Sequence, residues 1–308
     1  MQVYGLQSSI WKNRLRLVYL MSLIPLFVLI VIALYSFFLN EDFGQGFIDT
    51  FAQTSFYLLP VVFLWTIIGV FLEKNIIFSF TGAKEITRME KPEIYNIVEN
   101  LCISRGLPIP KIAIIDDSSM NAFATGWSPK KSWVVFSQGL IDKLNKEEIE
   151  AVSGHELTHI INGDVKNMVI INVFIGAIGT IGYHLMKMSS GSSSSSKKGG
   201  NPLVFLGLLL YVLSIIILPL INLAISRKKE LLADAGSVEI TKNSLAMISA
   251  LEKISQDSVI EKITKQSSNI ASMFISNPKE KPRYFASIRG LFSTHPPIEE
   301  RIELLKKY

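Results

Sequence analysis

The sequence predicts a mostly helical α+β protein, in which a water-facing domain is joined to one apolar helical hairpin and interrupted by a second. Three observations lead to this prediction. Hydrophobic residues make up 49% of the 308 residues and charged residues only 19%, which is too apolar for an ordinary soluble enzyme. The apolar residues gather in four long runs, with the charged residues between them. The intervening stretches show helical spacing and two short strand patterns.

Residues 1–80 are predicted to form an N-terminal transmembrane hairpin. The run 15–39 is uncharged except at Arg16, just inside its start, and is long enough to cross a bilayer; it lacks a signal-peptide cleavage site, so we expect an anchor that stays. The second run, 56–72, is marginal in length. Basic residues flank the pair on its outer ends, whereas the loop 41–49 is acidic. The positive-inside rule therefore places the N-terminus and everything after the second run in the cytoplasm.

Residues 81–166 are predicted to form the first part of the soluble domain. Asn145 begins a helix whose third residue is Glu148, a pairing typical of a capping box. The elements expected here are a helix over 92–105, strands over 111–115 and 133–136, a loop around Gly126 and Pro129, and a helix from Asn145 to Asn162 and Gly163.

Residues 167–226 are predicted to form a second hydrophobic hairpin. Its apolar runs, 168–186 and 203–225, are separated by a Ser/Gly-rich tract at 189–200 that has the composition of a flexible linker. The lysines of this tract would lie outside if the hairpin crossed, against the charge rule, but the length of the last run favours crossing. Residues 227–308 are predicted to be the second, mostly helical part of the soluble domain.

The net charge of +5 does not indicate a nucleic-acid partner, because Lys and Arg cluster beside the apolar runs and no basic patch with interleaved aromatics is evident. The single cysteine, Cys102, excludes an internal disulfide and fits a reducing compartment. We interpret it as a buried apolar thiol in preference to a nucleophile.

The segment 155–159 reads His-Glu-Leu-Thr-His, an HExxH motif. On a helix, His155 and His159 lie one above the other, so both imidazoles can reach one ion. Glu156 is rotated away from them by about 100°, which lets it take a proton from a zinc-activated water without being a ligand itself. The alternative is a surface helix that happens to carry two histidines. The capped amphipathic helix favours a metal site.

A zinc site needs a third protein ligand. Glu230 and Asp234 are four residues apart downstream, so Glu230 can ligate while Asp234 hydrogen-bonds a ligand histidine. The other histidines, His184 and His295, are further candidates. The simpler interpretation of the 230–234 segment is a solvated charged face that follows a membrane helix.

Several of these segments together resemble HtpX-type membrane metalloproteases, which are relatives of the CAAX prenyl protease. The resemblance rests on ordered motifs and covers nearly the whole chain; it departs from the usual pattern at the Ser/Gly-rich insert. It implies a zincin-type (gluzincin) protease domain with one Zn²⁺ per subunit and with Glu230 as third ligand. The motifs are the Gly154-to-His159 helix, its Asn162-Gly163-Asp164 exit, Asn121 to Gly126, the Ser226-to-Ser237 segment, and Thr294 to Pro297 with Arg301.

The resemblance also implies roles around the reacting peptide. Asn121 and Ala122 would lie beside the cleft, where an extended substrate pairs with a strand edge; Asn121 could equally be an ordinary loop-starting residue. His295, held by two prolines, could donate to the oxyanion, and Arg301 could orient it or bind substrate. The alternative is that 294–297 merely caps the following helix.

The function expected from the resemblance is endoproteolysis of misfolded or damaged membrane proteins at the cytoplasmic face of the inner or plasma membrane. The partners would then be unfolded polypeptides and the lipid bilayer. A prenyl-type C-terminal processing protease is less favoured, because four apolar runs seldom enclose a chamber. A metal transporter should hold its ligands within spans, yet the HExxH helix is soluble in character. An intact Glu156 gives no reason to prefer an inactive metal-binding scaffold.

Overall fold

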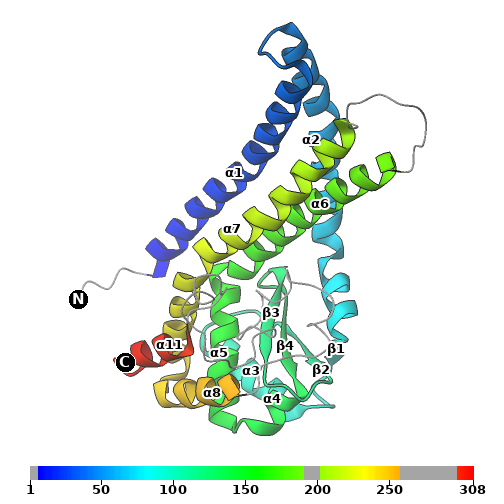
Figure 1. The fold of residues 1–308 in the computed structure, drawn as a ribbon. Coiled ribbons are helices and arrows are strands. Elements are labelled where there is room, and N and C mark those ends of the chain that lie inside the picture. The colour runs from blue at the N-terminus through cyan, green and yellow to red at the C-terminus, as the bar shows by residue number, and fades with distance from the viewer. Residues whose placement is uncertain (1–5, 191–201, 257–296) are drawn as a thin grey trace. The chain divides into compact units, whose positions relative to one another are not determined.

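The computed structural model describes residues 6–190, 202–256 and 297–308, and the chain divides into two compact units (Figure 1). Met1–Phe71 and Ile170–Leu218 form the first, here called the helical unit. Leu72–Val169 and Pro219–Tyr308 form the second, here called the sheet unit. The sequence had suggested borders at 80, 166 and 226.

The helical unit is built from α1, α2 and the apolar parts of α6 and α7. Their bounds are Leu6–Asn40, Gln45–Thr81, Asp164–Ser190 and Pro202–Thr241. The side chains at its centre come from all four helices: Val28, Val31, Ile32 and Tyr35 of α1, Val62 of α2, Ile178 of α6, and Leu206 and Leu210 of α7.

The second apolar run is part of a longer helix than the sequence indicated. The run 56–72 was marginal as a span, but α2 has 37 residues and is long and apolar enough to cross a membrane. Within the described residues, Pro25–Asn40 and Pro202–Ile216 are shorter apolar helical stretches. α2 is longer because a polar segment precedes the run and because residues after it pack on the sheet.

Glycines allow α6 and α7 to approach closely. A Cβ on Gly182 would lie 2.7 Å from the carbonyl oxygen of Gly207, and one on Gly207 would lie 2.7 Å from that of Gly182. Gly182 therefore faces another helix, which is how membrane helices use small residues.

The sheet unit contains a four-stranded sheet in the order β1-β2-β4-β3. β2 and β4 are parallel, and the two outer strands are antiparallel to their neighbours. The predicted strands 111–115 and 133–136 are confirmed as β2 and most of β4. The strand bounds are Lys84–Ile86, Lys111–Ile115, Ala122–Ser128 and Lys131–Ser137, from β1 to β4.

Two strands were not predicted, and both are marginal strands by sequence. β1 has three residues, and β3 contains three small residues and Gly126, whose φ of +126° and adjacent bulge interrupt the regular ladder. β3 is extended because it pairs with β4, where long-range pairing outweighs weak local preference. The segment expected as a loop around Gly126 is therefore mostly strand.

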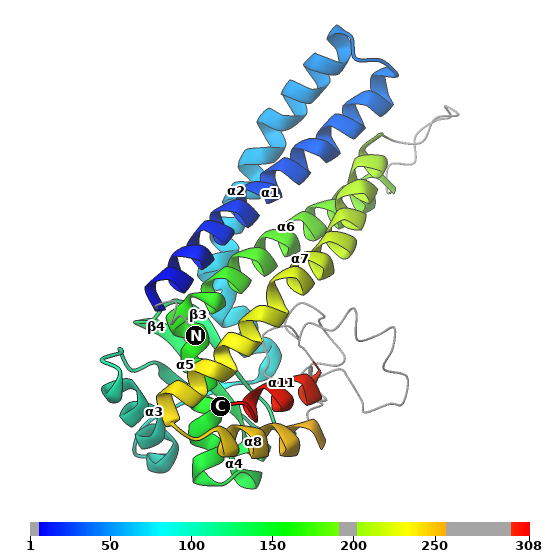
Figure 2. The ribbon, with the colours of Figure 1, turned by 90° about the vertical axis from the view of Figure 1, so that its left-hand side faces the viewer.

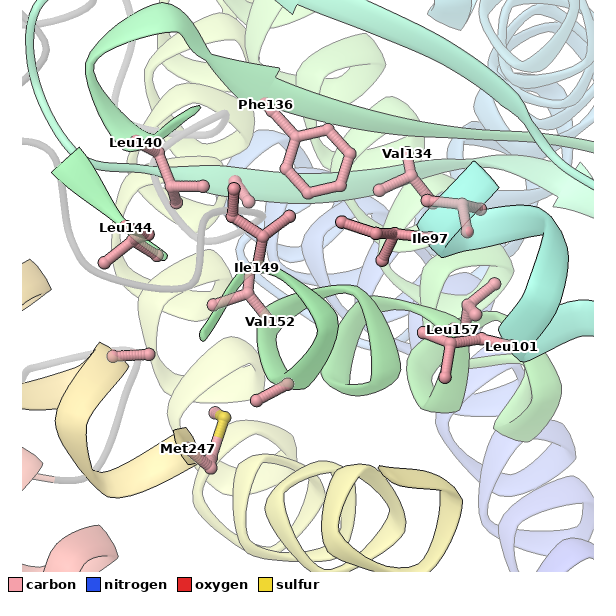
Figure 3. Close-up of a cluster of buried hydrophobic side chains, with 14 of the residues drawn as sticks. Ile97, Leu101, Val134, Phe136, Leu140, Leu144, Ile149, Val152, Leu157 and Met247 are labelled. Atoms are coloured by element: carbon pink, nitrogen blue, oxygen red, sulfur yellow. The ribbon is translucent and has the colours of Figure 1, made fainter. Parts of the chain in front are cut away.

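Helices cover both faces of this sheet. On one face, α3 and α5 join α8 and α11 in the main core, part of which appears in Figure 3. Phe136 and Val134 of β4 meet Ile149 and Val152 of α5 there, and Met247 of α8 lies on the other side of α5. On the other face, the last turns of α2 pack against the sheet through Ile77 and Phe78. Figure 2 shows α11 beside α8. The helix bounds are Pro92–Ser104 for α3, Gln138–Lys143 for α4, Lys146–Asn162 for α5, Ser244–Gln256 for α8 and Ile298–Leu305 for α11.

The ends of α5 are fixed by local interactions, and its predicted bounds are confirmed. The Asn145 side chain accepts from the Glu148 backbone, and the Glu148 carboxylate accepts from the Asn145 backbone, which is the predicted capping box. Gly163 ends the helix in the left-handed region at φ +71°, where a residue without Cβ is favoured. The Glu148 carboxylate also accepts from Ser249 and Lys253, which ties α5 to α8.

α5 and α7 cross at a contact made of small side chains. The Ser237 hydroxyl donates to the Ala151 carbonyl at 2.5 Å, and a Cβ on Gly154 would lie 3.2 Å from the same hydroxyl oxygen. A Cβ on Gly236 would overlap the Thr158 side chain. The two helices are therefore close enough for short side chains on each to reach a common point.

Gly236→Val should separate these helices, because its side chain would overlap Thr158. We expect the variant to lose about 1–3 kcal/mol of stability and to melt several degrees lower. Thermal denaturation in detergent measures this. Leu232→Val, on the exposed face of α7, introduces the same β-branch without the overlap. Equal melting temperatures for the two variants would contradict the importance of the contact.

Candidate metal centre

Three residues of the sheet unit form a group able to hold a metal ion. His155 and His159 lie on α5 and Glu230 lies on α7, and one ligand atom from each falls within 4.8 Å of the others. The two imidazole Nε2 atoms are 3.1 Å apart. The Glu230 carboxylate oxygens lie 3.6 Å from Nε2 of His155 and 3.5 Å from Nε2 of His159.

These separations match the spacing of ligands around a tetrahedral ion. Two ligand atoms bound at the usual zinc distances would lie about 3.3–3.4 Å apart. The separation between the two Nε2 atoms, and the separation from each Nε2 to one of the two Glu230 oxygens, scatter around that value. The donor set of two imidazoles and one carboxylate therefore fits a small divalent cation and leaves a fourth position for water.

The outward-facing nitrogen of His155 is held by an aspartate. Its Nδ1 lies 2.9 Å from Oδ1 of Asp234, one turn beyond Glu230 on α7. A carboxylate at Nδ1 keeps the proton there and leaves Nε2 free for a cation. The spacing of Glu230 and Asp234 predicts Asp234 beside a ligand histidine, and in the structure that histidine is His155.

Arg301 of α11 donates two hydrogen bonds to this aspartate. Its Nε donates to Oδ2 of Asp234 at 2.8 Å and one terminal nitrogen donates to Oδ1 at 2.6 Å. Another terminal nitrogen lies 3.5 Å from a Glu230 oxygen, and the whole side chain is buried. We had expected Arg301 to orient His295 or to bind substrate; the described contacts give it a positioning role at Asp234 and Glu230. His295 lies outside the described residues.

The outward-facing nitrogen of His159 meets a second aspartate, to which the sequence analysis gave no role. Nδ1 of His159 lies 3.2 Å from Oδ2 of Asp164, and Nζ of Lys229 lies 3.3 Å from the other oxygen of that carboxylate. All three side chains are largely buried. The sequence signal was the position of Asp164, which directly follows the C-cap Gly163 and so lies close after the last histidine.

The carboxylates and imidazoles of the site shift one another's pKa. Burial opposes charge on His159, but the hydrogen bonds to Asp164 and Glu230 outweigh it and raise its pKa to about 10. Burial likewise opposes charge on Asp234, and the Arg301 guanidinium overcomes this and lowers its pKa to about 2. Burial raises the pKa of Glu156, which makes this carboxylate a stronger base.

The balance of buried charge also fits a divalent cation. Within the described part of the site, the four carboxylates face two basic side chains, those of Arg301 and Lys229, so two negative charges remain. A divalent ion would neutralise them with both imidazoles uncharged; without one, protons on the imidazoles or on the carboxylates must do so. The carboxylates are those of Glu156, Asp164, Glu230 and Asp234.

The residues expected at the cleft lie at the start of β3. Asn121 is buried; its backbone N–H donates to Oγ of Ser137, and its carbonyl accepts from the Ser137 N–H. Because this carbonyl points towards β4, the backbone of the next residue, Ala122, faces the free edge of the sheet. The Asn121 side-chain oxygen accepts from the Ala122 N–H. Of the other ligand candidates, His184 lies on α6 in the helical unit and is not part of the described metal group.

Comparison with known proteins gives consistent relatives. The model of Peptidase family M48 matches residues 88–308. A Protease HtpX homolog of Bacteroides fragilis is 40% identical over the full length of both chains. One from Streptococcus uberis is 34% identical over 98% of this chain and 99% of its own. The crystal structure of S. mikatae Ste24p aligns with 84% of this chain and 65% of its own at 22% identity, with a TM-score of 0.47.

Glu230→Gln should weaken divalent-metal binding by at least about 10-fold, because a neutral amide replaces an anionic ligand. Competition with a chromophoric chelator, with metal analysis after dialysis, measures the affinity. Glu252→Gln removes an equivalent charge from the exposed face of α8 and should bind metal normally. Unchanged affinity in the Glu230 variant would move the third ligand elsewhere.

Proposed function

The chain belongs to peptidase family M48, in its HtpX-type group, and is a metalloprotease; from this premise we propose that it is a membrane-bound zinc endopeptidase. Its substrates are misfolded or damaged membrane proteins, cleaved at the cytoplasmic face of the cell membrane in protein quality control. The observation that carries the chemistry is the convergence of His155, His159 and Glu230. Membrane location and substrate class rest on the apolar helices and on the resemblance of the motifs.

Zinc is the metal that this donor set favours. Two imidazoles and one carboxylate with an open fourth position are the usual ligands of catalytic zinc in hydrolases, whereas calcium and magnesium prefer oxygen ligands throughout. Zinc bound there would polarise both the attacking water and the scissile carbonyl. We propose one Zn²⁺ per subunit, held by His155, His159 and Glu230.

Glu156 then serves as the general base. It follows His155 on α5, is buried, and its pKa is raised by burial, so it can take the proton of the attacking water and pass it to the leaving amine. Arg301 and Asp234 hold His155 in the tautomer that directs Nε2 inward. The role of oxyanion donor stays with His295 as a prediction.

The free edge of the sheet along β3 suggests how a substrate is held. β3 is an outer strand, α5 packs beside it, and the backbone of Ala122 faces the free edge. An extended polypeptide could add along β3 by main-chain hydrogen bonds, which depend little on substrate side chains. This mode suits an enzyme that acts on many unfolded sequences.

Exposed apolar surface supports the membrane location. Phe56, Phe63 and Phe71 of α2 are 72%, 67% and 80% exposed, a surface that water would disfavour and lipid would cover. We propose that α1 and α2 cross as a hairpin and that the apolar parts of α6 and α7 cross as another. An even number of crossings between His159 and Glu230 is required for both to reach one ion.

Glu156→Gln should abolish peptide hydrolysis while metal stays bound, because the carboxylate is a base and not a ligand. Casein cleavage and self-cleavage in detergent, with metal analysis of the same sample, test both statements. Glu150→Gln, on the same helix but nearer its start, should retain activity. Undiminished proteolysis by a metal-loaded Glu156 variant would refute the assignment.

The N-terminus, the HExxH helix and Tyr308 should all be cytoplasmic, with the acidic 41–49 loop outside. Single cysteines in a Cys102→Ser background, labelled with a membrane-impermeant reagent in right-side-out vesicles, should react in that loop but not near Lys146 or Tyr308. Outside labelling near both Lys146 and Tyr308 would reverse the orientation. Labelling of only one of these two would contradict the convergence of the ligands, since it requires an odd number of crossings.

A further inference from the structure

Lysines stacked on tryptophans mark both points where the chain joins the first half of the sheet unit. The chain enters at Leu72 and leaves at Val169. Two residues after the entry, Nζ of Lys74 lies 4.2 Å from the ring centre of Trp133. Three residues before the exit, Nζ of Lys166 lies 4.3 Å from that of Trp127. Each lysine is thus within three residues of an apolar helical run.

These contacts place the β3–β4 hairpin next to both junctions. Trp127 is near the end of β3, and Trp133 is near the start of β4. The turn between the two strands, 128–131, carries Lys130 and Lys131, both exposed. The side chain of Trp127 is 43% exposed, although it is large and mostly apolar. We call Lys74, Trp127, Lys130, Lys131 and Lys166 the basic hairpin surface.

The lysines that contact tryptophans gather at one end of the sheet. The register pairs Lys111 with Trp133 and Ile115 with Ser137, so the basic turn lies at the end where β2 begins. The acidic pair Asp116 and Asp117 follows β2 at the opposite end. At the basic end, Glu85 is already paired with Lys111 at 2.9 Å, so it does not neutralise the hairpin lysines.

An apolar stripe continues along α2 beyond the entry point. The stripe consists of every fourth residue, Leu72, Ile76 and Phe80, whose side chains are 46%, 42% and 40% exposed. Glu73, on the adjoining face of the helix, is buried and accepts a hydrogen bond from Thr125. One side of these turns packs on the sheet and another presents bulky apolar groups beside Lys74. Tryptophan, lysine and exposed apolar groups together are the composition of a membrane interface.

We infer that the basic hairpin surface binds the headgroups of anionic phospholipids, so that the β3–β4 hairpin rests on the cytoplasmic leaflet. This inference rests on the proposed membrane-bound function and goes beyond it. Each lysine near an anionic leaflet raises the affinity for the membrane by about fivefold. The indole ring of a tryptophan prefers the headgroup layer of the bilayer. The consequence is that β3, the outer strand, is held at the height where a polypeptide leaves the bilayer.

The test uses the full chain, with Cys102→Ser and a nitroxide attached at Ser128→Cys, reconstituted in vesicles. Collision with a water-soluble nickel chelate reports exposure of the label. In phosphatidylcholine with phosphatidylglycerol, we expect exposure at least about threefold lower than in phosphatidylcholine alone, because the lysines draw the hairpin to the charged surface. High salt should restore exposure. A label at Ser118→Cys, at the other end of the sheet, should respond to neither lipid.

Charge-matched variants separate this surface from general attraction. Lys130→Gln, Lys131→Gln and Lys166→Gln together should abolish the lipid dependence. Lys84→Gln, Lys146→Gln and Lys242→Gln, which remove the same charge from exposed positions elsewhere, should preserve it. Inorganic phosphate added to neutral vesicles should not protect the label; protection by phosphate would overturn headgroup binding in favour of a free-anion site.

The outcomes also distinguish this inference from the proposed function. A chain that stays with the vesicles after a carbonate wash, but whose label is equally exposed with both lipids, overturns the inference and leaves the membrane protease intact. Equal protection by both lipids also overturns it, because the contact would then be apolar. Loss of the chain in the wash overturns the membrane location and the inference together.

Discussion

The burial of four carboxylates beside two imidazoles is the constraint on which the catalytic half of the molecule depends. A charge that is removed from water and left without a partner costs several kcal/mol or more. Here the two aspartates that lie beside the Nδ1 atoms of the histidines each meet a cation: Asp234 meets Arg301 and Asp164 meets Lys229. Glu230 and Glu156 supply the excess negative charge that suits a divalent ion. Four elements must therefore meet at one point, because each carries part of the charge.

That meeting depends on close helix packing. Side chains as short as His and Glu reach a common ion only if α5 and α7 are very near each other, and Gly154, Gly236 and Ser237 provide this approach. The rotational phase of α7 is equally constrained, because one residue corresponds to 100°. Glu230 and Asp234, one turn apart, then face His155 together, one towards Nε2 and one towards Nδ1.

Local signals account for what the sequence could predict. α5 was predictable to its ends because Asn145, Glu148 and Gly163 fix them through neighbours in the chain. The convergence of His155, His159 and Glu230 was expected from spacing and from the resemblance to a family. β3 was missed, because its small residues gain their conformation from pairing with β4. The partners of Arg301 and Lys229 were also missed. Arg301 pairs with Asp234, 67 residues away, and Lys229 of α7 pairs with Asp164 at the start of α6. Contacts between such distant residues leave no periodic pattern in the sequence.

The two histidines differ in how their Nδ1 atoms are held, and the aspartate beside His155 depends on a residue of α11. Asp164 directly follows the helix that carries His159, so this arm is nearly complete once α5 and the start of α6 have formed. Asp234 depends on Arg301, whose guanidinium grips it with two hydrogen bonds from α11. Until α11 docks, Asp234 is a buried anion facing His155 without its arginine. The His155 side of the centre is therefore completed only by the last helix, which makes the catalytic geometry a property of the whole folded sheet unit.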